Sequence, residues 1–228
     1  MSSPPVLAID GPSGSGKGTI ARRVAEALGW HLLDSGALYR LAALAAARQG
    51  KSGASAVELA RVSGGLNVRF DTDEQGRERI WLDGDDVTAA VRAEECGREA
   101  SRIARVAEVR DALIGLQRDF RRRPGLVADG RDMGTRIFPD AVLKVFLTAS
   151  PAVRAQRRHK QLIGKGIDVS LPALSRDIAA RDRRDSERSV APLEAAGDAR
   201  LLDSSNLTIE EVTRTVLDWV QERLPEQT

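Results

Sequence analysis

The stretch IDGPSGSGKGT occupies residues 9–19 and follows the short apolar run VLA at residues 6–8. Gly11, four further residues, Gly16 and Lys17 match the pattern of a loop that binds nucleotide phosphates. Glycines let backbone N–H groups converge on an anion because no Cβ stands in the way, and a following helix adds the partial positive charge of its N-terminus. The pattern requires a strand before it and a helix after it. The stretch therefore predicts a phosphate-binding loop in an α/β protein.

Two other interpretations of this stretch are weaker. One is an ordinary glycine turn that packs a helix against a sheet, and the other is a dinucleotide-binding loop. Asp34 favours the second, because it ends the next apolar run, where a ribose-binding acid is expected. However, Thr19 stands where that motif has its last glycine, and Lys17 has no role in it. Gly18 is itself unusual, because many phosphate-binding loops carry there a Ser or Thr that binds Mg²⁺.

Apolar runs and helical patterns alternate along the chain. The runs that we predict to be strands cover residues 6–9, 30–33, 126–129, 142–147 and 199–203. Apolar residues at helical spacing separate them, for example from Ile20 to Leu28, where Gly29 is expected to end the helix. Strands connected through helices form parallel sheets that the helices cover. We therefore predict an α/β fold with a five-stranded parallel sheet and helices on both faces.

The middle of the chain departs from this alternation. Apolar and polar residues alternate in 66–70 and again in 80–82, which indicates a small antiparallel insertion. Before it, Ser55 and Glu58 form the capping box of a helix. After it, helical periodicity extends from about residue 94 to residue 122.

The last third of the chain returns to helices and one strand. Ser150 and Pro151 suit the N-cap and first position of a long arginine-rich helix. A loop around IGKGID, residues 163–168, interrupts that helix, and a final amphipathic helix covers 209–224.

Length and composition are those of a soluble globular protein. The 228 residues are 42% hydrophobic and 30% charged, which suffices for one sizeable core. The sequence has no uncharged apolar run of about 18 residues, so we predict no membrane contact, and its start, MSSPPVLAID, does not resemble a secretory signal. A single cysteine, Cys96, permits neither an internal disulfide nor a CxxC site. We therefore expect a cytoplasmic location.

The charge is unevenly distributed. Residues 151–190 carry ten Lys or Arg against five Asp or Glu, net +5, so the rest of this chain of net charge +2 carries −3. Arginines stand near hydrogen-bond acceptors in SGALYR (35–40), ADGRDMGT (128–135) and RDRRDSER (181–188). Bringing a second phosphate up to a nucleotide opposes like charges, at roughly 4 kcal/mol per close pair at an effective dielectric of about 20, and fixed guanidiniums offset this cost. The pattern favours phosphoryl transfer to an acceptor that is itself a phosphate, and the N-K-x-D element of GTP-binding switches does not occur.

A phosphate acceptor also needs no general base, because its second pKa is about 6 and it is already a dianion near pH 7. The two histidines agree with this: His31 lies on a strand that reads as buried and His159 in a basic helix, and we expect neither to be catalytic. Positioning and electrostatics should therefore supply most of the rate.

Five blocks together resemble the bacterial cytidylate kinases, within the nucleoside monophosphate kinases. They are IDGPSGSGKGT, WHLLDSGALYR, LVADGRDMGT, FPDA and RDRRDSERSVAPL, in that family's order and spacing from about Val6 to Val216. The resemblance implies ATP-dependent phosphorylation of CMP and dCMP to CDP and dCDP. From the residues we also expect a monomer, because nothing in the sequence demands a partner, and no binding of nucleic acid.

For the phosphate donor, the resemblance implies that ATP binds to the loop with Mg²⁺ as cofactor. The ATP-binding residues would be Gly11, Pro12, Ser13, Gly14, Ser15, Gly16, Lys17, Gly18, Thr19 and Arg157. Lys17, Arg131, Arg184 and Arg188 would be catalytic. Asp129, at a strand end, is the candidate for Mg²⁺, although as an isolated feature it also reads as a strand-end acid that caps a turn or pairs with Arg131.

For the acceptor, the resemblance implies a CMP site of eight residues. These are Ser35, Arg40, Ser101, Arg110, Arg131, Asp132, Asp185 and Arg188. Three arginines suit the α-phosphate (Arg40, Arg131 and Arg188), and Asp185 suits a sugar hydroxyl. Cytosine presents an amino donor beside acceptors, which suits Asp132 with Ser101 and Arg110. By themselves, Ser101 reads as a solvated helical serine and Arg110 as a helix-surface charge.

The resemblance also implies a division of the chain into a core, a CMP-binding region and a lid. The core comprises residues 1–34, 123–150 and 191–228, the CMP-binding region 35–122 with its antiparallel insertion at about 63–102, and the lid 151–190. The lid would close over ATP, with Arg154, Arg157, Arg158, Arg181 and Arg184 as candidates to contact phosphate.

Three other hypotheses stay open from the residues. A nucleic-acid-binding protein would use the basic segment, but only 4% of the residues are aromatic and none stands among those arginines. A catalytically silent scaffold would keep the same fold. A kinase for another nucleoside monophosphate is the third.

Overall fold

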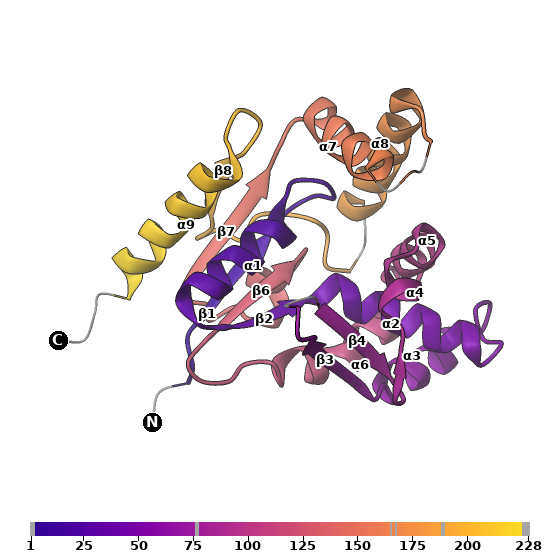
Figure 1. Cartoon of the computed structure of the whole chain (residues 1–228). Coiled ribbons are helices and arrows are strands. Elements are labelled where there is room, and N and C mark those ends of the chain that lie inside the picture. The colour runs from indigo at the N-terminus through magenta and orange to yellow at the C-terminus, as the bar shows by residue number, and fades with distance from the viewer. Residues whose placement is uncertain (1–2, 76–77, 165, 167, 188–189, 225–228) are drawn as a thin grey trace. The chain divides into compact units, whose positions relative to one another are not determined.

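The computed structural model describes residues 3–75, 78–164, 166, 168–187 and 190–224, and it divides into two compact units. Unit 1 comprises residues 1–34 and 120–228, and unit 2 residues 35–119. Figure 1 shows the elements of both. In the described part of the chain, no helix has both the length and the apolar character that crossing a membrane requires.

Unit 1 is built on a parallel sheet of five strands in the order β2-β6-β1-β7-β8. Its elements are β1 (Val6–Asp10), α1 (Lys17–Leu28), β2 (His31–Asp34), β6 (Leu126–Gly130), the π-helix η1 (Met133–Ile137), β7 (Leu143–Thr148), α7 (Pro151–Ile163), α8 (Leu171–Ser186), β8 (Arg200–Asp203) and α9 (Ile209–Arg223). All four strand pairs are parallel, and β1 pairs with β6 so that Asp10 lies opposite Gly130. The predicted five-stranded parallel sheet is confirmed.

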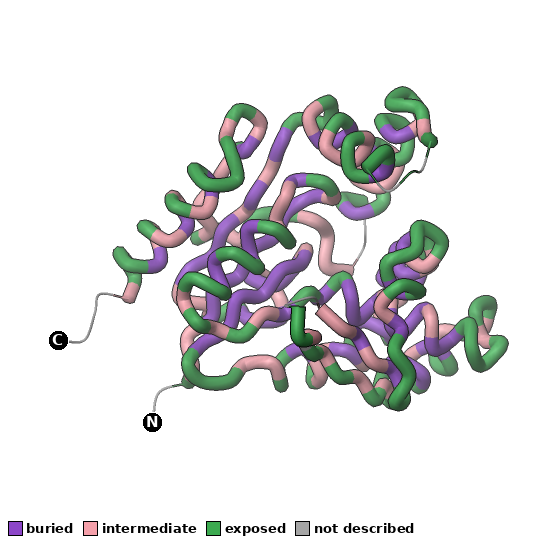
Figure 2. The backbone as a smooth tube through the Cα atoms, in the orientation of Figure 1, coloured by how far each residue is buried: buried purple, intermediate pink, exposed green. Residues whose placement is uncertain are grey.

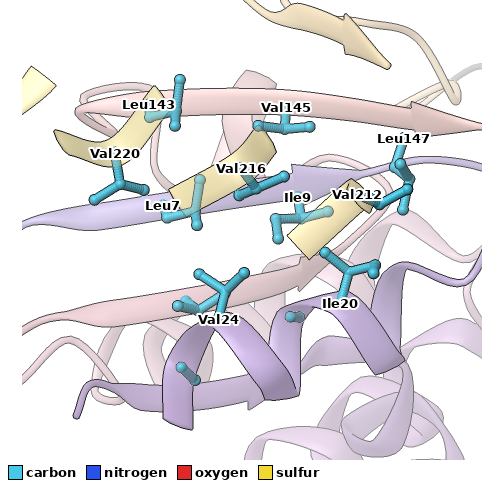
Figure 3. Packing of buried hydrophobic residues seen from close by; sticks show 13 residues of the cluster. Leu7, Ile9, Ile20, Val24, Leu143, Val145, Leu147, Val212, Val216 and Val220 are labelled. Atoms are coloured by element: carbon cyan, nitrogen blue, oxygen red, sulfur yellow. The ribbon is translucent and has the colours of Figure 1, made fainter. Parts of the chain in front are cut away.

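The main core of unit 1 lies between this sheet and the helices α1 and α9. Alternate side chains of a strand point to opposite faces, so Leu7 and Ile9 of β1 pack with Val24 of α1 and Val216 of α9, as Figure 3 shows. Burial of each such side chain stabilises the fold by about 1.5–3 kcal/mol. β1 and β6 are buried along their whole length, whereas the surfaces of α7 and α8 are largely exposed (Figure 2).

Glycines stand at both ends of α1, the helix that follows the loop. Gly16 precedes the helix with φ 94°, and Gly29 ends it with φ 63°, both in the left-handed region where other residues are strained. The predicted end of this helix at Gly29 is therefore confirmed.

The second apolar run forms an edge strand, β2, which corrects the expectation that His31 lies on a buried strand. Among the strands that the structure describes, β2 pairs only with β6, and His31 is exposed, not buried. Its Nε2 lies 2.9 Å from the carbonyl oxygen of Arg123. A strand at the edge of a sheet leaves part of its surface outside the core, which periodicity over four residues does not reveal.

Unit 2 combines helices with a small antiparallel sheet in the order β3-β4-β5. Its elements are α2 (Ser35–Arg48), α3 (Ala56–Gly64), β3 (Val68–Thr72), β4 (Glu78–Leu82), β5 (Asp85–Asp86), α4 (Thr88–Arg92), α5 (Glu94–Ile103) and α6 (Ala107–Arg118). Within this unit α3 packs on α6 and α2 on α5. The predicted antiparallel insertion and the capping box of Ser55 and Glu58 are confirmed.

The periodic stretch from residue 94 to residue 122 is two helices rather than one. α5 ends at Ile103 and α6 begins at Ala107, with Val106 in an extended conformation between them. The stretch has no Pro or Gly at the break to signal it. The guanidinium of Arg110 reaches back to the carbonyl oxygen of Ala104, 3.1 Å away, and so satisfies a backbone acceptor that a continuous helix would have paired.

Candidate active site

The phosphate-binding loop lies at the carboxyl end of β1, where its shape depends on the absence of side chains. At Gly11 a Cβ would overlap the carbonyl oxygen of Leu147 on β7. The loop then turns into α1, whose first residue is Lys17. Strand, loop and helix thus follow in the order that a phosphate-binding loop requires.

Lys17 lies inside this loop and beside an acid of the neighbouring strand. Its Nζ donates a hydrogen bond to the Pro12 carbonyl oxygen at 3.3 Å and lies 4.0 Å from Asp129 Oδ1. Burial lowers the pKa of Lys17, and the nearby positive charge of Arg131 lowers it further. Burial raises the pKa of Asp129, and the charge of Lys17 opposes this rise. Both groups are thus buried in surroundings that disfavour an isolated charge. An anionic ligand that binds here would pair with the lysine.

Asp129 has a carboxylate oxygen that accepts no hydrogen bond from the described residues. Its Oδ1 is buried without a hydrogen-bond partner among the described residues, and its Oδ2 lies 3.1 Å from where a Cβ of Gly18 would stand. A cavity of about 250 Å³ opens here. It is lined by Gly18, Thr19, Arg22, Leu32, Asp34 and Asp129.

This donor set fits a hard divalent cation that keeps most of its water. Carboxylate oxygens are the protein ligands that Mg²⁺ prefers, and the buried Asp129 oxygen offers one. The described residues contain no cluster of three acidic, histidine or cysteine side chains that would form a complete cage. Water and nucleotide oxygens would therefore supply the remaining ligands, as is usual for Mg²⁺ at phosphate sites.

Arg131 and Asp185, both predicted to bind CMP, are paired with each other. Arg131 Nε donates to Asp185 Oδ2 at 3.0 Å, and Arg131 Nη1 donates to the Gly130 carbonyl oxygen at 3.3 Å. The side chain of Asp185 is 1% exposed and that of Arg131 is 16% exposed, so the arginine is the member that solvent or a ligand can reach. Asp132, the next residue, is buried.

The segment of Arg131 and Asp132 is held by Asp10, a residue for which the sequence pattern predicted no separate role. Asp10, the last residue of β1, accepts hydrogen bonds from the backbone N–H groups of Met133 (2.9 Å) and Gly134 (2.8 Å) at the start of η1. Burial raises the pKa of Asp10 to about 6, although both hydrogen bonds act in the other direction. A charged residue that ends an otherwise apolar strand, VLAID, was the available signal.

Two arginines of α7 contact the loop from outside. Arg154 is buried and bonds the carbonyl oxygen of Ser13 at 3.1 Å. Arg157, predicted to bind ATP, donates from Nη1 to the Ser15 carbonyl oxygen at 3.1 Å and to Ser204 Oγ at 3.0 Å. Both side chains therefore reach the loop that we expect to hold the triphosphate.

The other arginines of the predicted lid differ in exposure. Arg158 is half-buried and bonds Gln161 Oε1 at 2.6 Å. Arg181 is also half-buried, and Arg184, predicted to be catalytic, is exposed and donates from Nε to the Ala180 carbonyl oxygen of its own helix at 3.2 Å. Arg188, predicted both as catalytic and as a CMP ligand, lies outside the described residues.

Four of the residues predicted for CMP belong to unit 2. Ser35 is buried and begins α2. Arg40 donates from Nη1 to the carbonyl oxygens of Val91 (2.8 Å) and Ala93 (3.0 Å). These bonds hold one edge of its guanidinium against the turn between α4 and α5.

Ser101 and Arg110 by themselves were expected to be solvent-exposed on a helix surface, and the structure differs. Both are buried, at 5% and 2% exposure, so neither is a solvated helix-surface group. Arg110 stacks over the ring of Tyr39 with 5.4 Å to the centroid. Ser101 Oγ has no hydrogen-bond partner among the described residues. A buried hydroxyl without a partner is unfavourable unless a ligand supplies one.

Comparison with known proteins gives one consistent family. The model of the cytidylate kinase family matches residues 7–222. Cytidylate kinase of Cupriavidus necator is 57% identical over 214 residues, 94% of each chain. Cytidylate kinase of Nitrosococcus oceani is 54% identical over 217 residues, 95% of this chain and 96% of the relative.

Among solved structures, an uncharacterized protein from Eubacterium ventriosum has a TM-score of 0.51 at 11% identity, over 95% of this chain and 98% of that one. At that identity the likeness concerns the fold alone. The family match covers almost the whole sequence, including the phosphate-binding loop and the segments of Asp129, Arg131 and Asp185. The chain therefore belongs to the cytidylate kinase family.

Proposed function

We propose that the protein is a (d)CMP kinase that transfers the γ-phosphoryl group of ATP to CMP or dCMP, giving CDP or dCDP. The observation that carries this proposal is the family match over residues 7–222. The local geometry supports it, since Lys17 is held inside a glycine loop at a helix N-terminus, where a nucleotide phosphate would bind.

On the donor side, the loop from Gly11 to Thr19 binds the phosphates of ATP through its backbone N–H groups. Lys17 pairs with the β- and γ-phosphates, and Arg157, which donates a hydrogen bond to the Ser15 carbonyl oxygen of the loop, completes the ATP site. Asp129 holds Mg²⁺ directly or through water. When bound, Mg²⁺ neutralises charge that develops on the phosphate oxygens.

On the acceptor side, arginines neutralise the α-phosphate of CMP, while buried polar groups select its base. Arg40, Arg131 and Arg188 are assigned to the phosphate, which requires Arg131 to share its guanidinium between Asp185 and the ligand. Asp185 meets a sugar hydroxyl, and Ser35 also lies in the CMP site. The assignment of Ser101, Arg110 and Asp132 to cytosine is supported by their burial, because a buried polar group discriminates strongly against a ligand that leaves it unpaired.

The reaction itself requires little covalent help from the protein. The α-phosphate of CMP is already a dianion near neutral pH, so one of its oxygens bonds to the γ-phosphorus without transferring a proton to a side chain. The bond between the γ-phosphorus and the β–γ bridging oxygen breaks, and ADP leaves. Lys17, Arg131, Arg184 and Arg188 act by neutralising the charge of the two phosphates as they approach. We place this activity in the cytoplasm, with a monomer as the working unit and residues 151–190 as a lid that excludes water over ATP.

The acceptor preference tests the proposal. We expect ADP release, measured in a coupled assay with MgATP, to be fastest with CMP and dCMP among CMP, dCMP, UMP, AMP and GMP. If both cytidine nucleotides are poor acceptors beside any of the other three, the cytosine assignment is wrong and another nucleoside monophosphate is the substrate.

The activity of the Arg131→Ala variant distinguishes the kinase hypothesis from that of a catalytically silent scaffold. We expect the variant to lose at least about 10²-fold in kcat/KM for CMP, which is typical of removing one group that stabilises the transition state. A wild-type protein without turnover on any of the five acceptors would favour the scaffold instead.

A further inference from the structure

Two carbonyl oxygens of the phosphate-binding loop are held by arginines of a single helix. Arg154 Nη1 donates to the Ser13 carbonyl oxygen and Arg157 Nη1 to that of Ser15, each at 3.1 Å. The arginines are three residues apart and share one face of α7, while the two carbonyls are two residues apart in the loop. Two arginines of α7 thus hydrogen-bond to alternate carbonyl groups of the loop, those of Ser13 and Ser15.

Holding a carbonyl also orients the next N–H group. A peptide group is planar and trans, so the C=O of one residue and the N–H of the next point in opposite directions. With the Ser13 carbonyl turned toward Arg154, the N–H of Gly14 points away from α7. The Ser15 carbonyl and the N–H of Gly16 are related in the same way. Backbone N–H groups of this loop are what it offers to a phosphate, and we take those of Gly14 and Gly16 to be among them.

The guanidinium of Arg154 is already engaged within the protein. Its Nε donates to the Ala149 carbonyl oxygen at 2.9 Å, and its Nη1 and Nη2 donate to the two carboxylate oxygens of Asp182 at 2.9 and 2.6 Å. With the bond to Ser13 this makes four hydrogen bonds, for a group that has five N–H donors. Arg154 is also only 4% exposed. Its side chain is therefore built into the fold between α7, α8 and the loop.

Asp182 fixes the orientation of this arginine. A carboxylate that accepts both bonds of a guanidinium fork sets the plane of the fork as well as its position. Asp182 lies on α8, the helix that also carries Asp185. The loop also packs closely on α7, since a Cβ added to Gly14 would lie 3.2 Å from the Cβ of Arg154 and 3.5 Å from its carbonyl oxygen. The loop, α7 and α8 are therefore joined at one point.

We propose that Arg154 is a positioning residue for nucleotide binding, oriented by Asp182, and that it acts on ATP through the Ser13–Gly14 peptide without touching a phosphate. The arrangement explains why Arg154 is buried and paired with the half-buried Asp182 beside the loop, where contact with a phosphate would require an accessible guanidinium. The inference rests on the proposed function only in that the loop binds ATP.

Kinetics and binding of matched variants test this role. We expect Arg154→Ala and Asp182→Ala each to raise the Kd for MgATP, measured by titration calorimetry without acceptor, about tenfold, and the KM for ATP in parallel. The double variant should be no weaker than the worse single variant, because Asp182 acts only through Arg154. The KM for CMP should change less than about twofold. Asp177→Ala, an exposed acid on the same helix, is the control and should leave all three constants unchanged.

Three results would overturn the proposal. If Asp182→Ala binds ATP normally while Arg154→Ala does not, Asp182 does not orient Arg154 for nucleotide binding. Multiplied losses in the double variant would show that the two residues act independently, and normal ATP binding by both single variants would leave Arg154 without a role. Should the alanine variants fail to fold, Arg154→Lys and Asp182→Asn are judged by the same criteria. A wild-type protein that binds ATP but does not phosphorylate CMP would refute the proposed function and leave this test intact.

Discussion

A methyl group on Gly18 would stand 3.1 Å from Asp129 Oδ2, closer than side chains normally pack. The carboxylate would have to move by a few tenths of an ångström, away from where we propose that it holds Mg²⁺. We therefore expect Gly18→Ala to lower kcat/KM for ATP on the order of tenfold, since small misplacements at a reacting centre are costly. Gly53→Ala, where a Cβ meets no atom within 4 Å, is the matched control. Equal activity of the two variants would show that Asp129 does not depend on the space at Gly18.

Asp10 gives the fold a predictable response to pH. Its pKa is about 6 in the folded protein and 3.8 in its ordinary state, so folding favours the protonated carboxyl. Relative to Asp10→Asn, the wild type should therefore be most stable below about pH 4 and lose stability as the pH rises to about 6. The loss should approach about 3 kcal/mol, at about 1.4 kcal/mol per unit of pKa. Urea denaturation of both proteins across this range measures it. A constant difference in unfolding free energy would show that folding does not change the pKa of Asp10.

At the scale of the elements, α9 covers the core of unit 1 and begins with a capping box. Thr208 Oγ1 accepts a hydrogen bond from the Glu211 backbone N–H at 3.2 Å, and Glu211 Oε2 accepts one from the backbone N–H of Thr208 at 2.8 Å. We expect Thr208→Ala to lower the free energy of unfolding by about 1 kcal/mol. Thr215→Ala, in the interior of the same helix, should change it little, because alanine is the better helix former there. Thermal or urea denaturation distinguishes the two, and equal losses would mean that the cap contributes nothing.

Helix ends were predictable where a local signal marks them. Gly29 ended α1 because its left-handed conformation suits glycine. Ser150 with Pro151 began α7, where the Val153 N–H donates a hydrogen bond to Ser150 Oγ. The break between α5 and α6 was not predictable, because no residue near it breaks a helix. Its compensation, the bond from Arg110 to Ala104, spans six residues and forms only when Arg110 is buried.

The residue types of the site were predictable, but their partners were not. The phosphate-binding loop is contiguous, so its role follows from a local pattern. Arg154, in contrast, was a candidate phosphate contact as one arginine of the lid that the resemblance implies. Its bonds to Ser13 and Asp182 join residues 141 and 28 positions away in the chain. Asp10 is 123 residues from Met133. Such pairs depend on how the strands and helices pack, which short-range periodicity does not specify.

Across the whole molecule, charge is divided in a way that should speed the encounter with ATP. Residues 151–190 carry +5 and the rest of the chain −3. A field concentrated on one segment draws an anion to that segment, and salt screens it, with a Debye length of about 10 Å at 0.1 M. We therefore expect kcat/KM for ATP to fall as NaCl is raised from about 0.05 to about 0.3 M, with kcat nearly constant.

Two double variants distinguish attraction by the charges of residues 151–190 from an effect of the net charge of the protein. Lys160→Gln with Arg176→Gln removes two exposed charges from residues 151–190, and Arg98→Gln with Arg214→Gln removes two exposed charges from elsewhere. The net charge of the protein changes equally in both double variants. We expect only the first to flatten the salt dependence of kcat/KM for ATP. If both flatten it equally, the net charge of the protein governs the encounter with ATP. If neither does, the arginines of this segment serve contacts at short range, such as those of Arg154 and Arg157 with the loop.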